Sequence, residues 1–148
     1  MKDTKLNILV VEDDHGLIRQ YRWALADCEV TVTSNRENAI AEFRRVRPPV
    51  VILDLGLPPE PDTTREGMIT LEAILATAPE TKIIVASGQD SHEAALRAIA
   101  LGAYDFYQKP VDVDLLRHMI ERAARVAELE SENRHLLEMT PRSPIDGV

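Results

Sequence analysis

Short apolar runs alternate along the chain with longer segments in which apolar residues recur at helical spacing. The apolar runs lie at residues 8–11, 30–33, 50–53, 83–86 and 104–107. The segments with helical spacing lie at residues 16–26, 37–46, 68–77, 92–101 and from 113 onward. Runs of this length predict strands, and the spaced segments predict amphipathic helices. The pattern therefore predicts a repeat of strand–helix units.

Polar residues and one glycine mark the expected helix ends. Ser34 or Asn35 and Asp112 are suitable N-caps, and Gly102 is a suitable C-cap. Near-continuous apolar strands that alternate with helices favour an α/β fold, with a parallel sheet covered on both faces. In such a sheet, ligands bind beyond the carboxyl ends of the strands. Functional residues are therefore expected at those ends.

Polar side chains stand at most of these strand ends. In chain order they are Glu12, Asp13 and Asp14 after the first run, Asp54 after the third, Ser87 after the fourth and Lys109 after the fifth. Neighbouring strands lie ~4.8 Å apart, so these side chains can meet in one cleft. Clustered carboxylates raise one another's pKa unless a divalent cation or a lysine offsets their charge. The sequence therefore predicts a Mg²⁺ site with Lys109 as a counter-ion.

The aspartate that ends the most apolar run is interpreted as a nucleophile. Mg²⁺ prefers a few carboxylate or carbonyl oxygens and bridges readily to a phosphoryl group. Asp13 and Asp54, with Glu12 and a carbonyl of the following loop, suit such an ion. Beside the metal, Asp54 can attack phosphorus, while Lys109 and the Ser87 hydroxyl contact phosphoryl oxygens. A single aspartate at a strand end is more often a turn residue, but the combination favours phosphoryl chemistry.

Composition narrows the class of protein. The chain has 148 residues, of which 45% are hydrophobic and 28% charged, as expected of a soluble domain with a tail. A net charge of −8 argues against direct binding of nucleic acid by this chain. The sequence contains no signal peptide and no apolar run of membrane-spanning length, so a cytoplasmic protein is expected. The single cysteine fits a reducing compartment.

The sequence resembles the receiver domain of bacterial two-component response regulators over about residues 6 to 127. The motifs that carry the resemblance are ILVVEDD, VVILDLGLP, IIVASG and GAYDFYQKPVD. The resemblance implies a flavodoxin-like, doubly wound (βα)5 fold with a five-stranded parallel sheet in the order 2-1-3-4-5. It also implies a phosphoacceptor signalling domain rather than an enzyme, in which a sensor histidine kinase phosphorylates Asp54.

Roles for individual residues follow from the same resemblance. Glu12, Asp13 and Asp54, with the carbonyl of Gly56, are expected to organise Mg²⁺. Ser87, Lys109 and Phe106 are expected to form the switch, in which the hydroxyl moves toward the phosphoryl group and the aromatic ring turns inward. The surface that changes is then the face formed by the fourth helix, the fifth strand and the fifth helix. A cis bond is expected between Lys109 and Pro110.

The chain departs from the family pattern in the loop after Asp54. Pro58 is separated from the next glycine, Gly67, by several more residues than the family usually has. Two interpretations of residues 58–67 remain open. The loop is either a tolerated surface insertion, or it gates the site or contacts a partner. Gly56 and Gln89 occupy positions that tune dephosphorylation in the family, and the sequence assigns no lifetime from them.

The last helical segment is longer than a small sheet requires. A heptad pattern runs along this segment, in which two sets of residues alternate: Met119, Val126 and Asn133 with Arg122, Leu129 and Leu136. Together they would form the seam of a two-stranded coiled coil, in which one polar Asn fixes the register. The pattern predicts a homodimer, with a solvent-exposed helix as the alternative. We predict a receiver domain at residues 1–127, followed by a helical linker and tail at 128–148. Regulators of the NtrC type have such a helix, so the chain resembles the N-terminal part of a longer transcriptional activator.

Two other classes share parts of this pattern. A flavodoxin-like electron carrier has the same fold, but the acidic residues 12–14 would repel a flavin phosphate. A Mg²⁺-dependent phosphatase with an aspartate nucleophile expects a second aspartate two residues later, where this chain has Gly56.

Overall fold

Parallel strands form the central layer of the molecule, in the order β2-β1-β3-β4-β5. The computed structural model describes residues 5–59 and 63–139. The strands are β1 (Asn7–Val11), β2 (Glu29–Thr33), β3 (Val50–Asp54), β4 (Lys82–Ser87) and β5 (Asp105–Gln108). Each lies within one or two residues of a predicted apolar run, and the predicted fold and strand order are confirmed.

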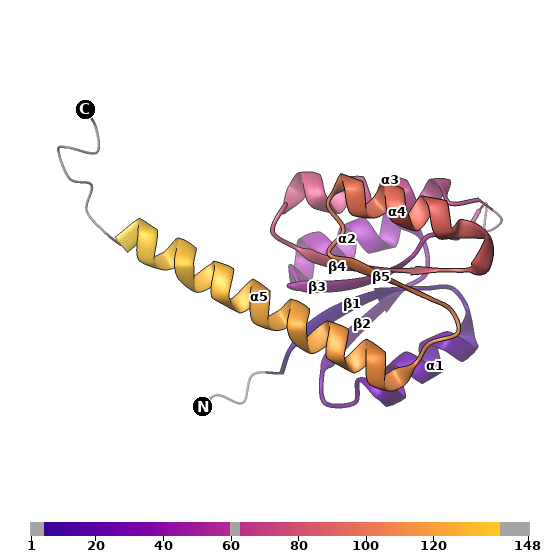
Figure 1. The fold of residues 1–148 in the computed structure, drawn as a ribbon, viewed down its shortest axis with the longest axis horizontal. Helices are drawn as coiled ribbons and strands as arrows, with labels where there is room; N and C mark the ends of the chain where they lie inside the picture. The colour runs from indigo at the N-terminus through magenta and orange to yellow at the C-terminus, as the bar shows by residue number, and fades with distance from the viewer. Residues whose placement is uncertain (1–4, 60–62, 140–148) are drawn as a thin grey trace.

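Helices cover both faces of this sheet (Figure 1). They are α1 (His15–Ala24), α2 (Arg36–Val46), α3 (Arg65–Thr77), α4 (His92–Leu101) and α5 (Val113–Met139), with a short 3-10 turn at Gln89–Ser91. Helices α2, α3 and α4 lie on one face, and α1 and α5 lie on the other. Within the described residues, no helix combines the length and the apolar character that a bilayer crossing requires.

Alternate residues of each strand face the two layers of helices. In β1, Ile8 and Val10 pack in the cluster that includes α1 and α5, whereas Leu9 and Val11 pack in the cluster that includes α2, α3 and α4. Every residue of β3 is buried because this strand lies in the middle of the sheet. The carboxylate of Asp54 is therefore held at the end of the most enclosed strand.

The helix caps follow the sequence prediction closely. Of the two candidates for α2, Asn35 is the N-cap, and its side chain accepts a hydrogen bond from the amide of Asn38. Asp112 accepts a hydrogen bond from the amide of Leu115 at 3.1 Å and so caps α5. Gly102 ends α4 with a φ of 122°, a conformation that favours glycine.

Helix α3 begins at Arg65 rather than at the predicted residue 68. Its first three residues have no apolar side chain that periodicity could detect, yet they are well anchored. Glu66 is buried there and forms an ion pair with Arg36 of α2 at 2.7 Å. Gly67 donates a backbone hydrogen bond to the carbonyl of Leu55 at 3.2 Å. Residues 60–62 of the long loop lie outside the described part of the chain.

Helix α5 starts in the core and then runs beyond the sheet (Figure 1). Its buried residues are Leu116, Met119, Ile120 and Ala123. The prediction that Met119 belongs to an intermolecular seam is therefore wrong, because this side chain is 3% exposed and fills the core under α5. The helix continues unbroken through residue 127, so the proposed domain boundary falls inside it and stays a prediction. Residues 140–148 of the predicted tail lie outside the described residues.

Candidate phosphoacceptor and metal site

Carboxylates gather where β1 and β3 end side by side. Glu12 and Asp13 directly follow β1, and Asp54 is the last residue of the neighbouring strand β3. One oxygen from each of the three side chains lies within 4.8 Å of the others. Glu12 is 1% exposed and Asp54 7%, while Asp13 lies at the open side of the cluster. The structure thus brings these predicted residues into one small site.

The third acidic residue after β1 has a different task. Asp14 is the N-cap of α1, and its Oδ1 accepts a hydrogen bond from the amide of Leu17 at 3.0 Å. The backbone amides of Asp13 and Asp14 also donate hydrogen bonds to Oε2 of Glu12, at 3.2 and 3.1 Å. The turn after β1 therefore fixes the Glu12 carboxylate through its own backbone.

Lys109 reaches this cluster from the loop after β5. Its Nζ lies 3.1 Å from Oδ1 of Asp54 and 3.3 Å from Oε1 of Glu12. Burial alone would lower the pKa of this ammonium, but the charges of Asp54 and Glu12 outweigh burial and raise it. The Lys109–Pro110 bond is cis, as expected. Lys109 is therefore a charged counter-ion shared by two carboxylates.

The remaining predicted residues lie around this centre. Ser87, at the end of β4, is buried, and its hydroxyl donates a long hydrogen bond of 3.5 Å to the carbonyl of Tyr107. The amide of Gly56 donates to Oδ1 of Asp54 at 3.2 Å. Phe106 is half-buried, and its ring meets His92 at the start of α4 edge to face, with 5.8 Å between ring centroids. Phe106 thus contacts the first residue of α4, and Ser87 directly follows Ala86, the residue paired with Asp54 across β3 and β4.

The acidic cluster fits a small divalent cation. Three carboxylates face a single lysine here, so the site carries excess negative charge. Oε1 of Glu12 is buried; among the described residues it has the ion pair with Lys109 at 3.3 Å but no hydrogen bond of good geometry. One ammonium cannot balance three clustered carboxylates, so a further cation would offset the remaining charge at this buried oxygen. Oxygen-only donors on a partly open site are the ligand set that Mg²⁺ prefers.

The sequence matches the family described as response regulator receiver domain over residues 8–121. The chain belongs to this family. Receiver domains act in phosphorylation-based signalling rather than as enzymes that turn over a substrate, and the match does not favour the flavodoxin-like carrier or the phosphatase as alternatives. The acidic cluster, Ser87 and Lys109 all lie within the matched residues.

Similar proteins include both long regulators and single-domain receivers. The nitrogen assimilation regulatory protein NtrX of Azorhizobium caulinodans is 32% identical over 136 residues, which are 90% of this chain and 29% of that protein. The chemotaxis protein CheY of Listeria monocytogenes is 28% identical, over 81% of this chain and 99% of its own. The crystal structure of the receiver domain of NtrX from Brucella abortus is 33% identical and matches 78% of this chain and 96% of its own, with a TM-score of 0.72. This receiver therefore spans less than a third of the first of these relatives.

A polar contact in the core between α1 and β5 was not predicted from the sequence. The hydroxyls of Tyr21 on α1 and Tyr107 on β5 form a hydrogen bond in the core, and both side chains are buried. Burial raises the pKa of both phenols, so both stay neutral. The helical spacing of apolar residues in α1 could have placed Tyr21 on the inward face, but no sequence signal links it to a residue 86 positions away.

The Glu12 carboxyl of the receiver is predicted to make stability depend on pH. Burial, then the charge of Asp54, raises its pKa from 4.5 to about 7, against the opposing effect of Lys109. The folded state therefore holds a proton that the unfolded state releases, and this stabilisation is present below pH ~4.5 and is lost as the pH rises through about 7. At 1.36 kcal/mol per pKa unit the loss is up to about 3 kcal/mol.

Glu12→Gln removes this titration. In chelator-containing buffer, we expect the variant to gain stability relative to the wild type as the pH rises from 4.5 to 8, measured by urea unfolding at each pH. A stability difference that stays constant over this range would contradict the prediction. Added Mg²⁺ should reduce the pH dependence of the wild type, because a bound cation replaces the proton.

Proposed function

We propose that Asp54 is the phosphoacceptor of this receiver and that a sensor histidine kinase supplies the phosphoryl group. The observation that carries the proposal is the position of Asp54, at the end of the buried strand β3, with Lys109 Nζ 3.1 Å from its Oδ1. Attack on phosphorus by Asp54 forms an acyl phosphate and leaves the donor histidine with the electrons of the broken bond. The reaction is one transfer to the protein itself rather than a turnover.

Glu12, Asp13 and Asp54, with the Gly56 carbonyl, are the residues that would hold Mg²⁺. When bound, the ion would neutralise charge on the phosphoryl oxygens. The protein's own contribution is to place its groups in advance. The backbone of residues 13 and 14 orients Glu12, and the amide of Gly56 orients Asp54. Lys109 supplies a fixed positive charge on the side of β5.

Ser87 and Phe106 are proposed to convert phosphorylation into a change of surface. The hydroxyl of Ser87 makes only a long hydrogen bond of 3.5 Å, to the carbonyl of Tyr107, so breaking this bond costs little free energy. A phosphoryl oxygen on Asp54 would be a stronger acceptor for it because it is charged. Movement of Ser87 vacates space near Phe106, whose half-buried ring can turn inward. The changed surface is then the face of α4, β5 and α5.

The whole protein is proposed to be a transcriptional activator of the NtrC type that works in the cytoplasm. NtrX of Azorhizobium caulinodans supports this, as does the regulatory protein AtoC of Escherichia coli, which is 27% identical to this chain. The matches cover 90% of this chain in both cases but only 29% and 28% of those proteins. DNA contact is assigned to a further domain rather than to this chain, whose net charge of −8 opposes binding to phosphates.

A small phosphodonor tests the phosphoacceptor role without the unknown kinase. Incubation with acetyl phosphate and Mg²⁺ is expected to label the receiver with one phosphoryl group, seen by intact-mass spectrometry. A chelator should abolish the label, and Asp13→Ala should raise the Mg²⁺ concentration needed for it. Equal labelling with and without Mg²⁺ would count against the proposal.

We also propose that the receiver forms a homodimer through α5. Leu129 is 52% exposed and Leu136 63%, and Val126 is half-buried, so the seam without Met119 remains accessible to a second copy. Full burial of a leucine contributes ~1.5–3 kcal/mol, which makes the seam significant but not sufficient alone. The α4-β5-α5 face is proposed to help, which makes the dimer sensitive to phosphorylation.

The double substitution Leu129→Glu and Leu136→Glu tests the seam. We expect dimer affinity to fall at least about tenfold, since the lost burial exceeds ~1.4 kcal/mol. His135→Glu adds a carboxylate to the other side of the same helix and should change affinity little. Light scattering over a concentration series, with and without beryllofluoride, measures the dimer affinity of the double variant and of His135→Glu. Equal affinities for the double variant and the wild type would mean that α5 is a solvated linker.

A further inference from the structure

A nearly buried lysine stands at the end of the sheet opposite to the phosphoacceptor site. Lys82 is the first residue of β4, and its side chain is only 12% exposed. Its backbone is fixed, because its amide donates to the carbonyl of Pro49 at 2.9 Å and its position in β4 pairs with Val50 of β3. A lysine at this depth requires a partner for its charge.

Glu130 of α5 supplies that partner. Its Oε1 lies 2.7 Å from Nζ of Lys82, although the residues are 48 positions apart in sequence. The same ammonium lies 5.9 Å from the ring centroid of Tyr104, which leads into β5. Tyr104 is itself joined to β4, since its amide donates to the carbonyl of Ile83 at 2.8 Å. One buried charge thus connects β4, the start of β5 and the distal half of α5.

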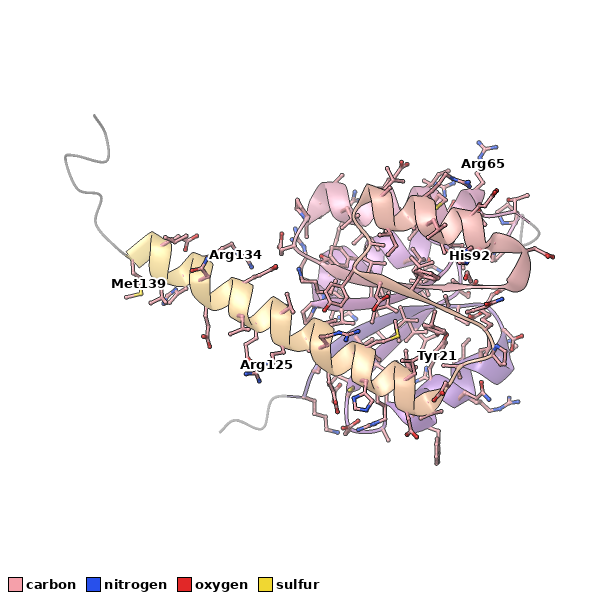
Figure 2. The ribbon with its side chains drawn as sticks, viewed as in Figure 1. Tyr21, Arg65, His92, Arg125, Arg134 and Met139 are labelled. Carbon is pink, nitrogen blue, oxygen red and sulfur yellow. The ribbon has the colours of Figure 1, made fainter. Side chains whose placement is uncertain are left out.

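Apolar packing holds this part of α5 only weakly. The last residue of α5 that is buried is Ala123, and all residues from 131 to 139 are exposed. Two grooves border the helix near Glu130, one of about 720 Å³ and one of about 180 Å³, and both are lined by Pro49, Ala127 and Ser131. Beyond Glu130 the helix projects from the body, with Arg134 and Met139 along it (Figure 2). The ion pair therefore lies where the helix leaves the domain.

We propose that Lys82, Tyr104 and Glu130 form a clasp that fixes the direction of the α5 extension. The clasp is independent of phosphorylation chemistry. Its consequence for assembly rests on the proposed dimer: a helix held in one direction presents Leu129 and Leu136 to a second copy at a lower cost in ordering entropy than a mobile helix does. Lys82 begins the strand that ends in Ser87, and Tyr104 directly precedes the strand that carries Phe106, so movement of these strands would reach the extension directly.

Substitutions on the two sides of the ion pair should have unequal effects on stability. Glu130→Ala leaves the lysine charge nearly buried without its partner, whereas Lys82→Met removes that charge and keeps the apolar stem. We expect Glu130→Ala to lower the melting temperature more than Lys82→Met, and the double variant to resemble Lys82→Met. Alanine is a good helix former, so the loss does not arise from helix propensity. Glu132→Ala, an exposed position on the same helix, is the matched control.

The direction of the helix can be measured by pulsed EPR. Spin labels are attached at Glu72→Cys on α3 and His135→Cys on α5, in a Cys28→Ser background and diluted with unlabelled protein so that only distances within one chain count. The proposal predicts one narrow distance distribution with the clasp intact. In Glu130→Ala and in Lys82→Met the distribution should become about twofold broader or more, as for a segment released from the fold.

Two results would overturn the clasp. One is an unchanged, narrow distribution in both variants, and the other is equal broadening in Glu132→Ala, which would indicate general fraying of α5. Dimer affinity of the same variants is measured separately by light scattering, where Glu130→Ala should weaken association. Broadened distances with unchanged association would refute the proposed link to the dimer while the clasp stands, so the two failures are distinguishable.

Discussion

Asparagine in place of Asp54 is expected to abolish phosphorylation by acetyl phosphate. The amide is nearly the same size as the carboxylate, so the strand end and its contact with the Gly56 amide can persist, but the amide is a poor nucleophile and a poor metal ligand. We expect no phosphoryl label above background in Asp54→Asn under conditions that label the wild type completely. The measurement is intact-mass spectrometry over a time course.

Asp90→Asn is the matched control for this result. Asp90 is exposed in the turn after β4, close to the site but outside the acidic cluster, and its replacement should leave labelling unchanged. Complete labelling of Asp54→Asn would show that another residue accepts the phosphoryl group. Retained folding of the variant is checked by its thermal unfolding.

Gly67→Ala is expected to destabilise the fold more than the same substitution at Gly16, Gly88 or Gly102. A Cβ at this position would lie 2.3 Å from Cα and 2.5 Å from the carbonyl oxygen of Leu55, which are backbone atoms that cannot rotate away. Alanine improves helix propensity by only ~1 kcal/mol. The overpacking costs about 3 kcal/mol or more, because the segment after β3 and the first turn of α3 must separate. The net effect is a loss of about 2 kcal/mol or more in urea unfolding.

Gly88→Ala provides the comparison. A Cβ there would meet nothing within 4 Å, so its effect on stability should be small. If Gly67→Ala were as stable as Gly88→Ala, the close contact between α3 and Leu55 would not exist in solution. The same contact explains why the chain keeps a glycine at residue 67 despite its longer loop.

The alternation of strands and helices was predictable because periodicity is a local property. The apolar run at residues 50–53 predicted the central strand. Asp54, Ser87 and Lys109 were predicted to belong to the site because they stand at the ends of predicted strands. Strand order was not visible in periodicity, because a pattern along the chain does not say which strands are neighbours. The order, and the roles of Phe106 and Gly56, came from the resemblance to receivers.

The unpredicted features all depend on contacts between distant parts of the chain. Lys82 and Glu130, like Tyr21 and Tyr107, form pairs whose partners only the folded structure identifies. Met119 was misassigned for a related reason, since a heptad position and a core position on α5 differ by a small rotation of the helix. The start of α3 was missed because backbone and ionic contacts, rather than apolar side chains, hold Arg65, Glu66 and Gly67 in place.

Peptide mapping of the labelled wild-type receiver identifies the residue that accepts the phosphoryl group. The chain is treated with acetyl phosphate in Mg²⁺ or in chelator, digested at low pH, where acyl phosphates survive longer, and analysed by tandem mass spectrometry. We expect one phosphoryl group in Mg²⁺, on the peptide that contains Asp54, and none in chelator. A phosphoryl group on any other residue, or on Asp54 to the same extent without Mg²⁺, would contradict this expectation.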